Sequence, residues 1–158
     1  MVKPALVDCL IGPTASGKSG LALWLAQAGG LNHGGQAVEI VSMDSALVYK
    51  AMDIGTAKPT PAERAQTPHH LIDILEPEQV FSVAQFLDQA KGAIQAIRRR
   101  GNRPLVVGGT MLYFKALLNG LDDLPSTPLS LRQALAAKAK ELGWPAMHAE
   151  LQNHDPLT

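Results

Sequence analysis

The chain has 158 residues, the length of one ordinary globular domain, and 46% of them are hydrophobic, enough for a buried core. Lys plus Arg and Asp plus Glu both number 14, so no overall basic field indicates a nucleic-acid-binding protein. A nucleic-acid partner would have to be held by a local patch. No apolar run approaches the roughly 20 residues that span a membrane. The single cysteine excludes an internal disulfide and fits a cytoplasmic protein.

Residues 12–19 match the phosphate-binding pattern G-x-x-x-x-G-K-[ST] at every fixed position. An apolar run of strand length, residues 5–11, precedes them, and helix-forming residues 20–27 follow. Small residues let backbone N–H groups surround a phosphate, and the helix N-terminus adds partial positive charge. A glycine-rich turn carrying Lys-Ser by chance is the alternative, and the flanking strand and helix disfavour it. The predicted phosphate-binding residues are Gly12, Pro13, Thr14, Ala15, Ser16, Gly17, Lys18 and Ser19.

Two side chains of this motif are expected to contact the phosphate or its metal ion. Lys18 supplies a full positive charge to a terminal phosphate, and the Ser19 hydroxyl suits a Mg²⁺ ion that bridges phosphate oxygens. The motif leaves open which phosphate compound is bound. Cys9, inside the preceding strand, is expected to be a small buried hydrophobic residue.

Residues 37–42 predict a second strand, and strand, helix, strand at this spacing favours a parallel sheet. Asp44 and Ser45 follow this strand directly. Ligands of open α/β sheets bind at the carboxyl edge, so both residues are expected to face the crevice that holds Lys18. Asp44 is alternatively an N-cap of the short turn after it.

Residues 52–59 form a polar loop that is expected to cover a substrate, with Lys58 as a solvated charge. A third strand is predicted at residues 71–75. His69 and His70 precede it without a third ligand at metal spacing, which favours a structural or RNA-facing role.

A capping box at Ser82 and Gln85 predicts the start of a long helix that stops at Gly101. The run 98–100 is expected to be the solvated, basic end of this helix. The predicted buried face of the helix comprises Val83, Phe86, Leu87, Ala90, Ile94 and Ile97.

Strand 104–107 is followed by Gly108, Gly109 and Thr110. A P-loop ATPase usually has an acidic residue after this strand, which holds magnesium and positions water. A Gly-Gly-Thr turn instead lets the backbone approach a ligand closely. It therefore favours binding and alignment of a substrate over ATP hydrolysis.

The expected fold is α/β, a P-loop NTPase-like parallel sheet flanked by helices over residues 1–118, carrying the donor and catalytic site. Residues 119–158 contain a linker and helical patterns at 129–142 and 144–151. They are expected to begin a helical insertion or lid.

Four blocks together resemble the bacterial tRNA dimethylallyltransferases, the tRNA isopentenyltransferases. These blocks are residues 12–19, 44–59, 68–73 and 108–113, and the resemblance covers essentially the whole chain. It implies a longer protein, of which this chain is the N-terminal part. Ala51 stands where the family often has glycine, which affects the conformation of that loop.

The resemblance implies transfer of a dimethylallyl group from dimethylallyl diphosphate to the exocyclic N6 amine of the adenosine beside the tRNA anticodon. The phosphate loop would hold the diphosphate with Mg²⁺, and Asp44 would be the general base. Thr110 would lie where donor and flipped base meet. The implied partners are tRNA and dimethylallyl diphosphate, acted on by a cytoplasmic monomer. The implied catalytic residues are Asp44, Lys18 and Thr110, and the implied tRNA contacts are Asp44, Ser45, Ala46, Leu47, Thr110 and Arg132.

Two other functions are consistent with parts of the sequence. A small-molecule kinase would use Lys18 and Ser19 on ATP, with Asp44 activating a hydroxyl acceptor; the Gly-Gly-Thr turn and the absence of an evident lid arginine group speak against it. A nucleotide-binding module could regulate a partner through the helical C-terminal region. Nothing positive in the sequence supports that reading.

Overall fold

The computed structural model describes residues 6–27, 36–121 and 127–157. The chain divides into two compact units, Met1–Leu121 and Asp122–Thr158. The first unit contains the parallel sheet and every predicted site residue except Arg132. The second contains a pair of helices.

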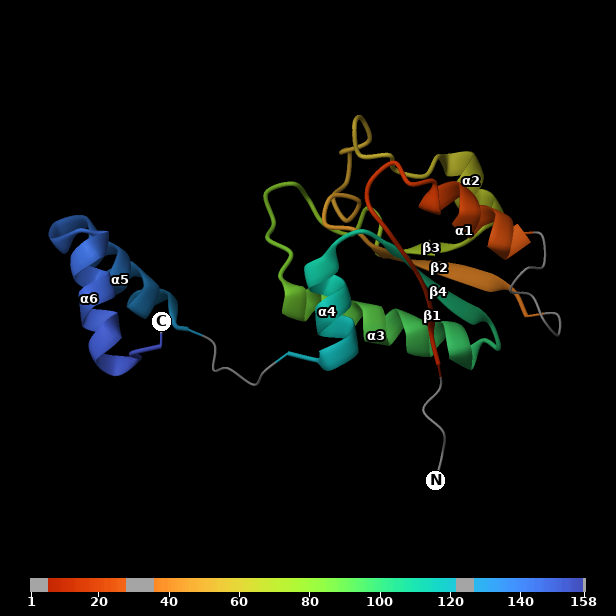
Figure 1. Ribbon diagram of the computed structural model, residues 1–158. Coiled ribbons are helices and arrows are strands. Elements are labelled where there is room, and N and C mark those ends of the chain that lie inside the picture. Colours follow the sequence, from red (N-terminus) through yellow and green to blue (C-terminus); the bar gives the residue numbers. More distant parts are fainter. Residues whose placement is uncertain (1–5, 28–35, 122–126, 158) are drawn as a thin grey trace, which may run out of the picture. The chain divides into compact units, whose positions relative to one another are not determined.

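A four-stranded parallel sheet forms the centre of the first unit (Figure 1). The strand order is β1 (Asp8–Ile11), β4 (Arg103–Gly108), β2 (Val38–Met43) and β3 (His69–His70). All six residues of β2 are buried, because this strand has neighbours on both sides and helices on both faces. The predicted α/β class and parallel sheet are confirmed.

The third strand was predicted at the wrong residues. It consists of His69 and His70, which the sequence had suggested would precede it. The chain then leaves the sheet, because Leu71 and Asp73 have left-handed φ values of 62° and 55°. Only Leu75 returns to an isolated bridge, with Tyr49. The mostly apolar residues 71–75 therefore form a largely buried bend and not a strand.

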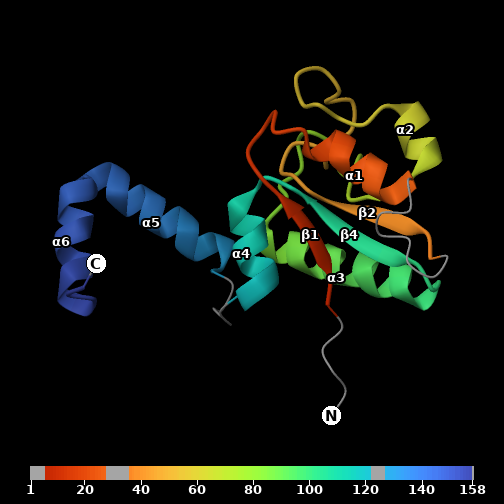
Figure 2. The same cartoon turned by 45° about the vertical axis from the view of Figure 1, so that its right-hand side comes forward.

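Helices cover both faces of the sheet (Figures 1 and 2). α1 (Lys18–Gln27) lies on one face, where Ala22 packs with Ile40 and Leu105. The short helix α2 (Pro61–Gln66) lies on the same side as α1. The sequence analysis did not predict it, although Thr60 and Glu63 form a capping box at its start.

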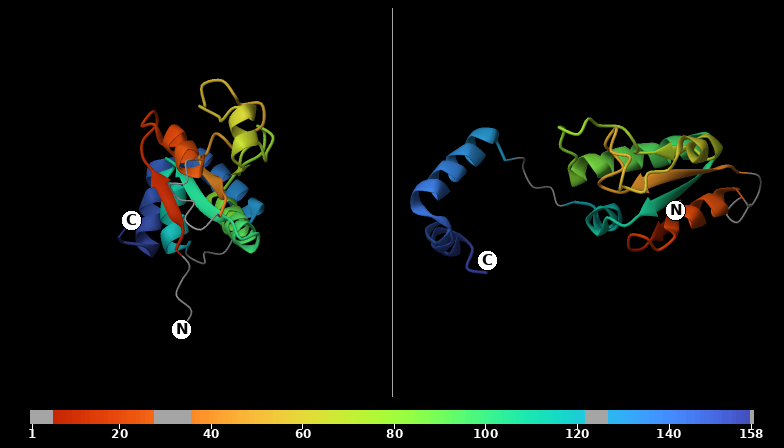
Figure 3. Two further views of the ribbon diagram at one scale, coloured as in Figure 1. Left: turned by 90° about the vertical axis from the view of Figure 1, so that its right-hand side faces the viewer. Right: turned by 90° about the horizontal axis from the view of Figure 1, so that it is seen from above.

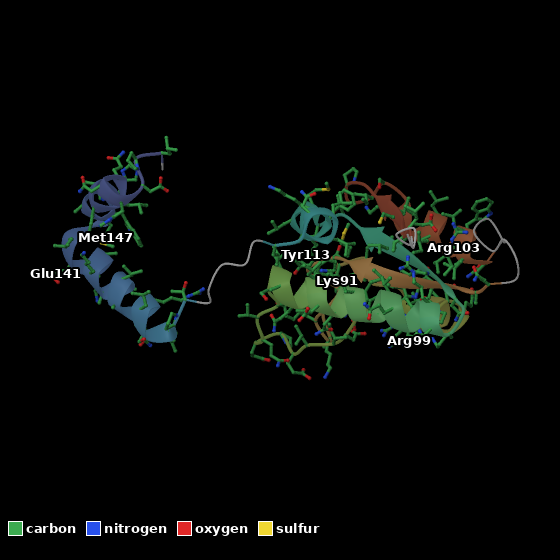
Figure 4. The ribbon with its side chains drawn as sticks, turned by 90° about the horizontal axis from the view of Figure 1, so that it is seen from below. Lys91, Arg99, Arg103, Tyr113, Glu141 and Met147 are labelled. Carbon is green, nitrogen blue, oxygen red and sulfur yellow. The ribbon has the colours of Figure 1, made fainter. Side chains whose placement is uncertain are left out.

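The opposite face is covered by α3 (Val83–Arg99) and α4 (Met111–Asn119), as the view from above also shows (Figure 3). The predicted capping box of α3 is present, with Ser82 and Gln85 exchanging hydrogen bonds. Tyr113 of α4 stacks on Phe86 with ring centroids 4.2 Å apart, whereas Lys91 and Arg99 lie exposed on the outside of α3 (Figure 4). The predicted apolar face is confirmed, with Val83 partly buried and the rest fully buried: Phe86, Leu87, Ala90, Ile94 and Ile97.

The basic end of α3 is not simply solvated. Arg100 donates two hydrogen bonds to the buried carboxylate of Glu39, from Nη2 at 2.7 Å and from Nε at 3.2 Å. Asn102 Nδ2 lies 2.7 Å from Glu39 Oε1, and His70 Nε2 lies 2.6 Å from Glu39 Oε2. These four residues, the Glu39 cluster, tie the end of α3 to β2 and β3. Arg100 is half exposed, so the helix end is solvated as predicted, but its guanidinium is also paired with Glu39.

Cys9 is exposed, contrary to the prediction of a buried residue. The reason is the strand order, since β1 lies at the edge of the sheet. In the part of the chain that the structure describes, no helix is long and apolar enough to cross a membrane.

The second unit contains α5 (Leu129–Leu142) and α6 (Trp144–His154), which pack against each other. Lys138 on α5 pairs with both carboxylate oxygens of Glu150 on α6, at 2.5 and 2.6 Å. Both helices were predicted, and α6 runs three residues beyond its predicted end at Leu151. Most of the predicted linker, residues 122–126, lies outside the described residues.

Candidate functional site

The phosphate loop connects the end of β1 at Ile11 to the start of α1 at Lys18. Ala15 and Gly17 have left-handed φ values of 63° and 81° within it. Lys18 Nζ donates to the backbone oxygen of Pro13 at 2.5 Å, and no carboxylate among the described residues pairs with it. The ammonium group therefore rests on a neutral carbonyl of its own loop, from which an anionic ligand could draw it.

Asp44 follows β2 at the carboxyl edge of the sheet, as predicted from its position after the strand. Its Oδ1 accepts hydrogen bonds from the backbone N–H groups of Ala46 at 2.8 Å and Leu47 at 3.3 Å. This is the capping role that the sequence analysis kept as an alternative. Among the described residues no donor reaches Oδ2, so the same carboxylate has one oxygen fixed by the backbone and one available to a ligand.

The Gly-Gly-Thr turn brings three segments together because it has no side chains at its first two positions. A Cβ on Gly108 would lie 2.0 Å from the backbone oxygen of Met43, and one on Gly109 would lie 2.9 Å from that of Gly12. An acidic residue after β4 is therefore sterically excluded at both positions. Thr110 Oγ1 accepts the Ser45 N–H at 3.2 Å, which ties this turn to the turn that contains Asp44.

These segments surround one cavity of about 780 Å³ at the carboxyl edge of the sheet. The size suits a small molecule together with part of a second one. Its wall includes Lys18, Ser19, Asp44 and Thr110. Of the predicted site residues, Thr14 through Ser19, Asp44 through Leu47 and Thr110 line it, while Gly12 and Pro13 are not among the lining residues. Arg132 is an exposed residue of α5 in the other unit.

The loop 52–59 covers part of this cavity and is held by a buried lysine. The Lys58 side chain is only 4% exposed, so the expectation of a solvated charge was wrong. Its Nζ lies 2.8 Å from Asp53, 2.6 Å from Asp73 and 2.8 Å from the backbone oxygen of Tyr49. Arg64 is the second partner of Asp73. Asp53 belongs to the same loop as Lys58, but Asp73 comes from the bend after β3, and nothing local in the sequence indicates that pairing.

The charges in this group of ion pairs, formed by Lys58, Asp53, Asp73 and Arg64, stabilise one another. Burial by itself would raise the pKa of Asp73, but hydrogen bonds from Lys58 and Arg64 outweigh it and hold that pKa below its usual value. Burial also opposes the charge on Lys58, and the two aspartates more than compensate, so the pKa of Lys58 is raised. The loop is therefore fixed by full charges at neutral pH.

His69 and His70 point to different surroundings because they alternate along β3. His69 lines the cavity, and its Nδ1 lies 2.7 Å from the backbone oxygen of Thr67. Since a carbonyl only accepts, Nδ1 carries the proton and Nε2 is left as an acceptor. Burial lowers the pKa of His69 and keeps it neutral. Over the described ranges, no three residues of the His, Cys, Asp and Glu types are grouped as metal ligands.

A parallel α/β sheet with a glycine-rich loop between β1 and α1, and with one cavity at its carboxyl edge, defines a protein of the P-loop NTPase-like fold class. Residues 47–158 match the family model described as IPP transferase. The chain therefore belongs to the IPP transferase family.

Individual relatives agree with this assignment. The tRNA dimethylallyltransferase of Methylibium petroleiphilum is 59% identical over 95% of this chain and 44% of the relative. That of Bordetella petrii is 53% identical over 100% of this chain and 48% of the relative. This chain thus spans about half the length of the curated relatives it matches.

Solved structures show the same fold. The full-length tRNA isopentenylpyrophosphate transferase of Bacillus halodurans superposes with a TM-score of 0.67 and 39% identity, over 96% of this chain and 48% of that one. A eukaryotic dimethylallyltransferase acting on tRNA superposes with a TM-score of 0.66 and 32% identity, over 78% of this chain and 30% of that one.

Proposed function

We propose that this chain carries the donor-binding and catalytic part of a tRNA dimethylallyltransferase. The observation that carries the proposal is the shared cavity, which is lined by the phosphate loop, Asp44 and Thr110. A diphosphate donor and an amine acceptor would meet there. The relatives named tRNA dimethylallyltransferase support the same reaction.

The phosphate loop would bind the diphosphate of dimethylallyl diphosphate. Its backbone N–H groups and the α1 N-terminus attract an anion, and Lys18 would move from the Pro13 carbonyl to a phosphate oxygen. Diphosphate leaves readily only when its developing charge is neutralised. Lys18 would therefore act in the transition state as well as in binding.

The oxygen atoms at this end of the cavity fit a Mg²⁺ ion. Ser19 offers a hydroxyl, a ligand type that this ion accepts, and the ion usually keeps several of its waters in such sites. When bound, the ion would add positive charge opposite the leaving diphosphate. Ser19 is the proposed direct ligand.

The acceptor would be the N6 amine of the adenosine beside the anticodon. This nitrogen is a weak nucleophile, because its lone pair is delocalised into the base. As its bond to C1 of the dimethylallyl group forms, the bond from C1 to the diphosphate oxygen breaks, and the electron pair leaves with diphosphate. Asp44 Oδ2 would take the N6 proton, while the Ala46 and Leu47 N–H groups hold the other oxygen still.

The adenine has to leave the stacked bases of the anticodon loop to enter this cavity, which costs a few kcal/mol and is easiest in a loop. The turn 44–47, Thr110 and Arg132 are the proposed tRNA contacts. We further propose a cytoplasmic monomer, in keeping with the low cysteine content.

Calorimetric titration of the 158-residue chain tests donor binding. With Mg²⁺ present, dimethylallyl diphosphate should bind at least about 10-fold more tightly than ATP, and Lys18→Ala should abolish that binding. Lys91→Ala, an exposed lysine on the outside of α3, is the matched control (Figure 4). Tight ATP binding without any response to the isoprenoid would instead support the kinase alternative.

The transfer step is tested in a chimera that joins residues 1–158 to the remaining residues of the Methylibium petroleiphilum relative. Asp44→Asn should lower the transfer rate by about 10²–10⁴-fold, the usual contribution of a general base, with donor affinity unchanged. The product is measured as the mass increase of adenosine in digested tRNA. Full turnover by this variant would remove Asp44 as the base.

A further inference from the structure

Ser42 carries a buried hydroxyl group without a partner. The residue is 4% exposed, and its Oγ makes no hydrogen bond to any of the described residues. Burying a hydroxyl without a partner is unfavourable. A partner is therefore expected to come from whatever enters the cavity, whose wall includes Ser42.

The sheet register places Ser42 in an otherwise apolar row. Ser42 on β2 is aligned with Val107 on β4, which is aligned with Leu10 on β1. Aligned residues of a parallel sheet face the same side, and Leu10 and Val107 pack in the cluster under α1. Ser42 is thus the one polar member of the last row on the α1 side.

The same row lies beneath the first turn of α1. Ala22 packs on Ile40, and α1 runs antiparallel to the strands. Moving from Ile40 to Ser42 advances about 6.6 Å toward the carboxyl edge. Moving back from Ala22 to Ser19 advances about 4.5 Å in the same direction. These two advances run toward the same edge, and both Ser19 and Ser42 line the cavity there.

This is also where a P-loop ATPase uses an acidic residue to hold magnesium and its waters. That residue follows the strand next to β1, which here is β4. The close contacts of Gly108 and Gly109 exclude any side chain there. Ser42 on β2, which is aligned with Val107 at the end of β4, offers a hydroxyl on the strand next to β4.

We propose that Ser42 Oγ accepts a hydrogen bond from a water molecule of the Mg²⁺ ion that binds with diphosphate at Ser19. Ser42 is then a positioning residue for the metal and not a direct ligand. Mg²⁺ usually keeps several of its waters in such sites, so an uncharged acceptor suffices. This inference rests on the diphosphate site of the proposed function, but not on the identity of the prenyl acceptor.

The test is calorimetric titration of inorganic pyrophosphate into the 158-residue chain at a series of Mg²⁺ concentrations. Ser42→Ala should raise the half-saturating Mg²⁺ concentration about 5-fold, the effect of one lost hydrogen bond. Pyrophosphate affinity without metal should stay unchanged. Ser42→Thr keeps the hydroxyl and should restore the Mg²⁺ dependence, and Ser130→Ala on α5 is the matched control.

Two results would overturn this assignment. One is an unchanged Mg²⁺ dependence in Ser42→Ala, and the other is an equal loss of pyrophosphate affinity with and without metal, which would mean a direct phosphate contact or a structural role. If the wild-type chain binds pyrophosphate with Mg²⁺ but ignores dimethylallyl diphosphate, the proposed function fails while the Ser42 assignment stands. A higher melting temperature of Ser42→Ala without ligand would support it, since an unpaired buried hydroxyl is removed.

Discussion

The Glu39 cluster should make the stability of the first unit depend on pH in the acid range. Burial by itself would raise the pKa of Glu39, but hydrogen bonds from Arg100, Asn102 and His70 and the charge of Arg100 lower it from 4.5 to about 2. A difference of about 2.5 pH units corresponds to about 3 kcal/mol. Arg100 is half exposed, so solvent screening reduces this to about 2–3 kcal/mol.

The lowered pKa of Glu39 determines how the free energy of unfolding changes with pH. The unfolded chain binds the proton of Glu39 more readily than the folded chain does. The contribution is therefore fully present above pH 4.5 and is lost as the pH falls toward 2. Glu39→Gln keeps the shape but not the charge. It should lower the free energy of unfolding by about 2–3 kcal/mol at pH 7, and by much less below pH 3.

Urea unfolding at pH 7, 5, 4 and 3 measures this difference. The chain has two tryptophans, so a Trp144→Phe background leaves Trp24 on α1 as the reporter of the first unit. Glu76→Gln removes an exposed ion pair with Lys50 and should change stability by less than about 0.5 kcal/mol at any pH. A Glu39→Gln effect of equal size at pH 7 and pH 3 would refute the reasoning, because it would mean that packing and not ionisation stabilises the cluster.

Three further substitutions test the backbone and the loop around the cavity. Ala51 has a left-handed φ of 57°, so Ala51→Gly should stabilise the first unit by about 0.5–1 kcal/mol in urea unfolding. The control Ala96→Gly, within α3, should destabilise it by about 1 kcal/mol, and a change of stability in the same direction for both variants would contradict this. Gly108→Ala should destabilise the first unit by more than about 3 kcal/mol, because the new Cβ would collide with the Met43 backbone. The control Gly92→Ala has open space around it and should stabilise the unit by about 1 kcal/mol. A tolerated Gly108→Ala would disprove the close approach of Gly108 to Met43. Lys58→Met should speed amide hydrogen exchange of residues 53–58 while leaving α3 protected. Unchanged exchange would mean that the ion pairs of Lys58 do not hold the loop.

The proposed transfer chemistry differs from ATP hydrolysis for a steric reason as well as a compositional one. The end of β4 is packed so closely against β2 and the phosphate loop that only glycine fits at two successive positions. The hydrogen bond from the Ser45 N–H to Thr110 Oγ1 joins the end of β4 to the turn that contains Asp44. The same contacts that exclude an acidic residue thus bring the proposed base toward the phosphate loop.

Local sequence determined several parts of this protein. The phosphate loop, the capping box and apolar face of α3, the strands β2 and β4 and the helices α5 and α6 all follow from short-range patterns, and each lies at or near its predicted residues. These patterns work because hydrogen bonds and periodicity within one element decide them. The placement of Asp44 at the sheet edge also follows from chain order.

Tertiary structure decided the rest, because the deciding partners are distant in the chain. Lys58 is buried only because Asp73 and the Tyr49 carbonyl meet it, and Arg100 is paired only because Glu39 lies across the sheet. Cys9 is exposed because the strand order leaves β1 at an edge. The unpartnered hydroxyl of Ser42 becomes visible only when its row and the cavity are known, since the sequence does not show that this side chain is buried or that no other residue reaches it.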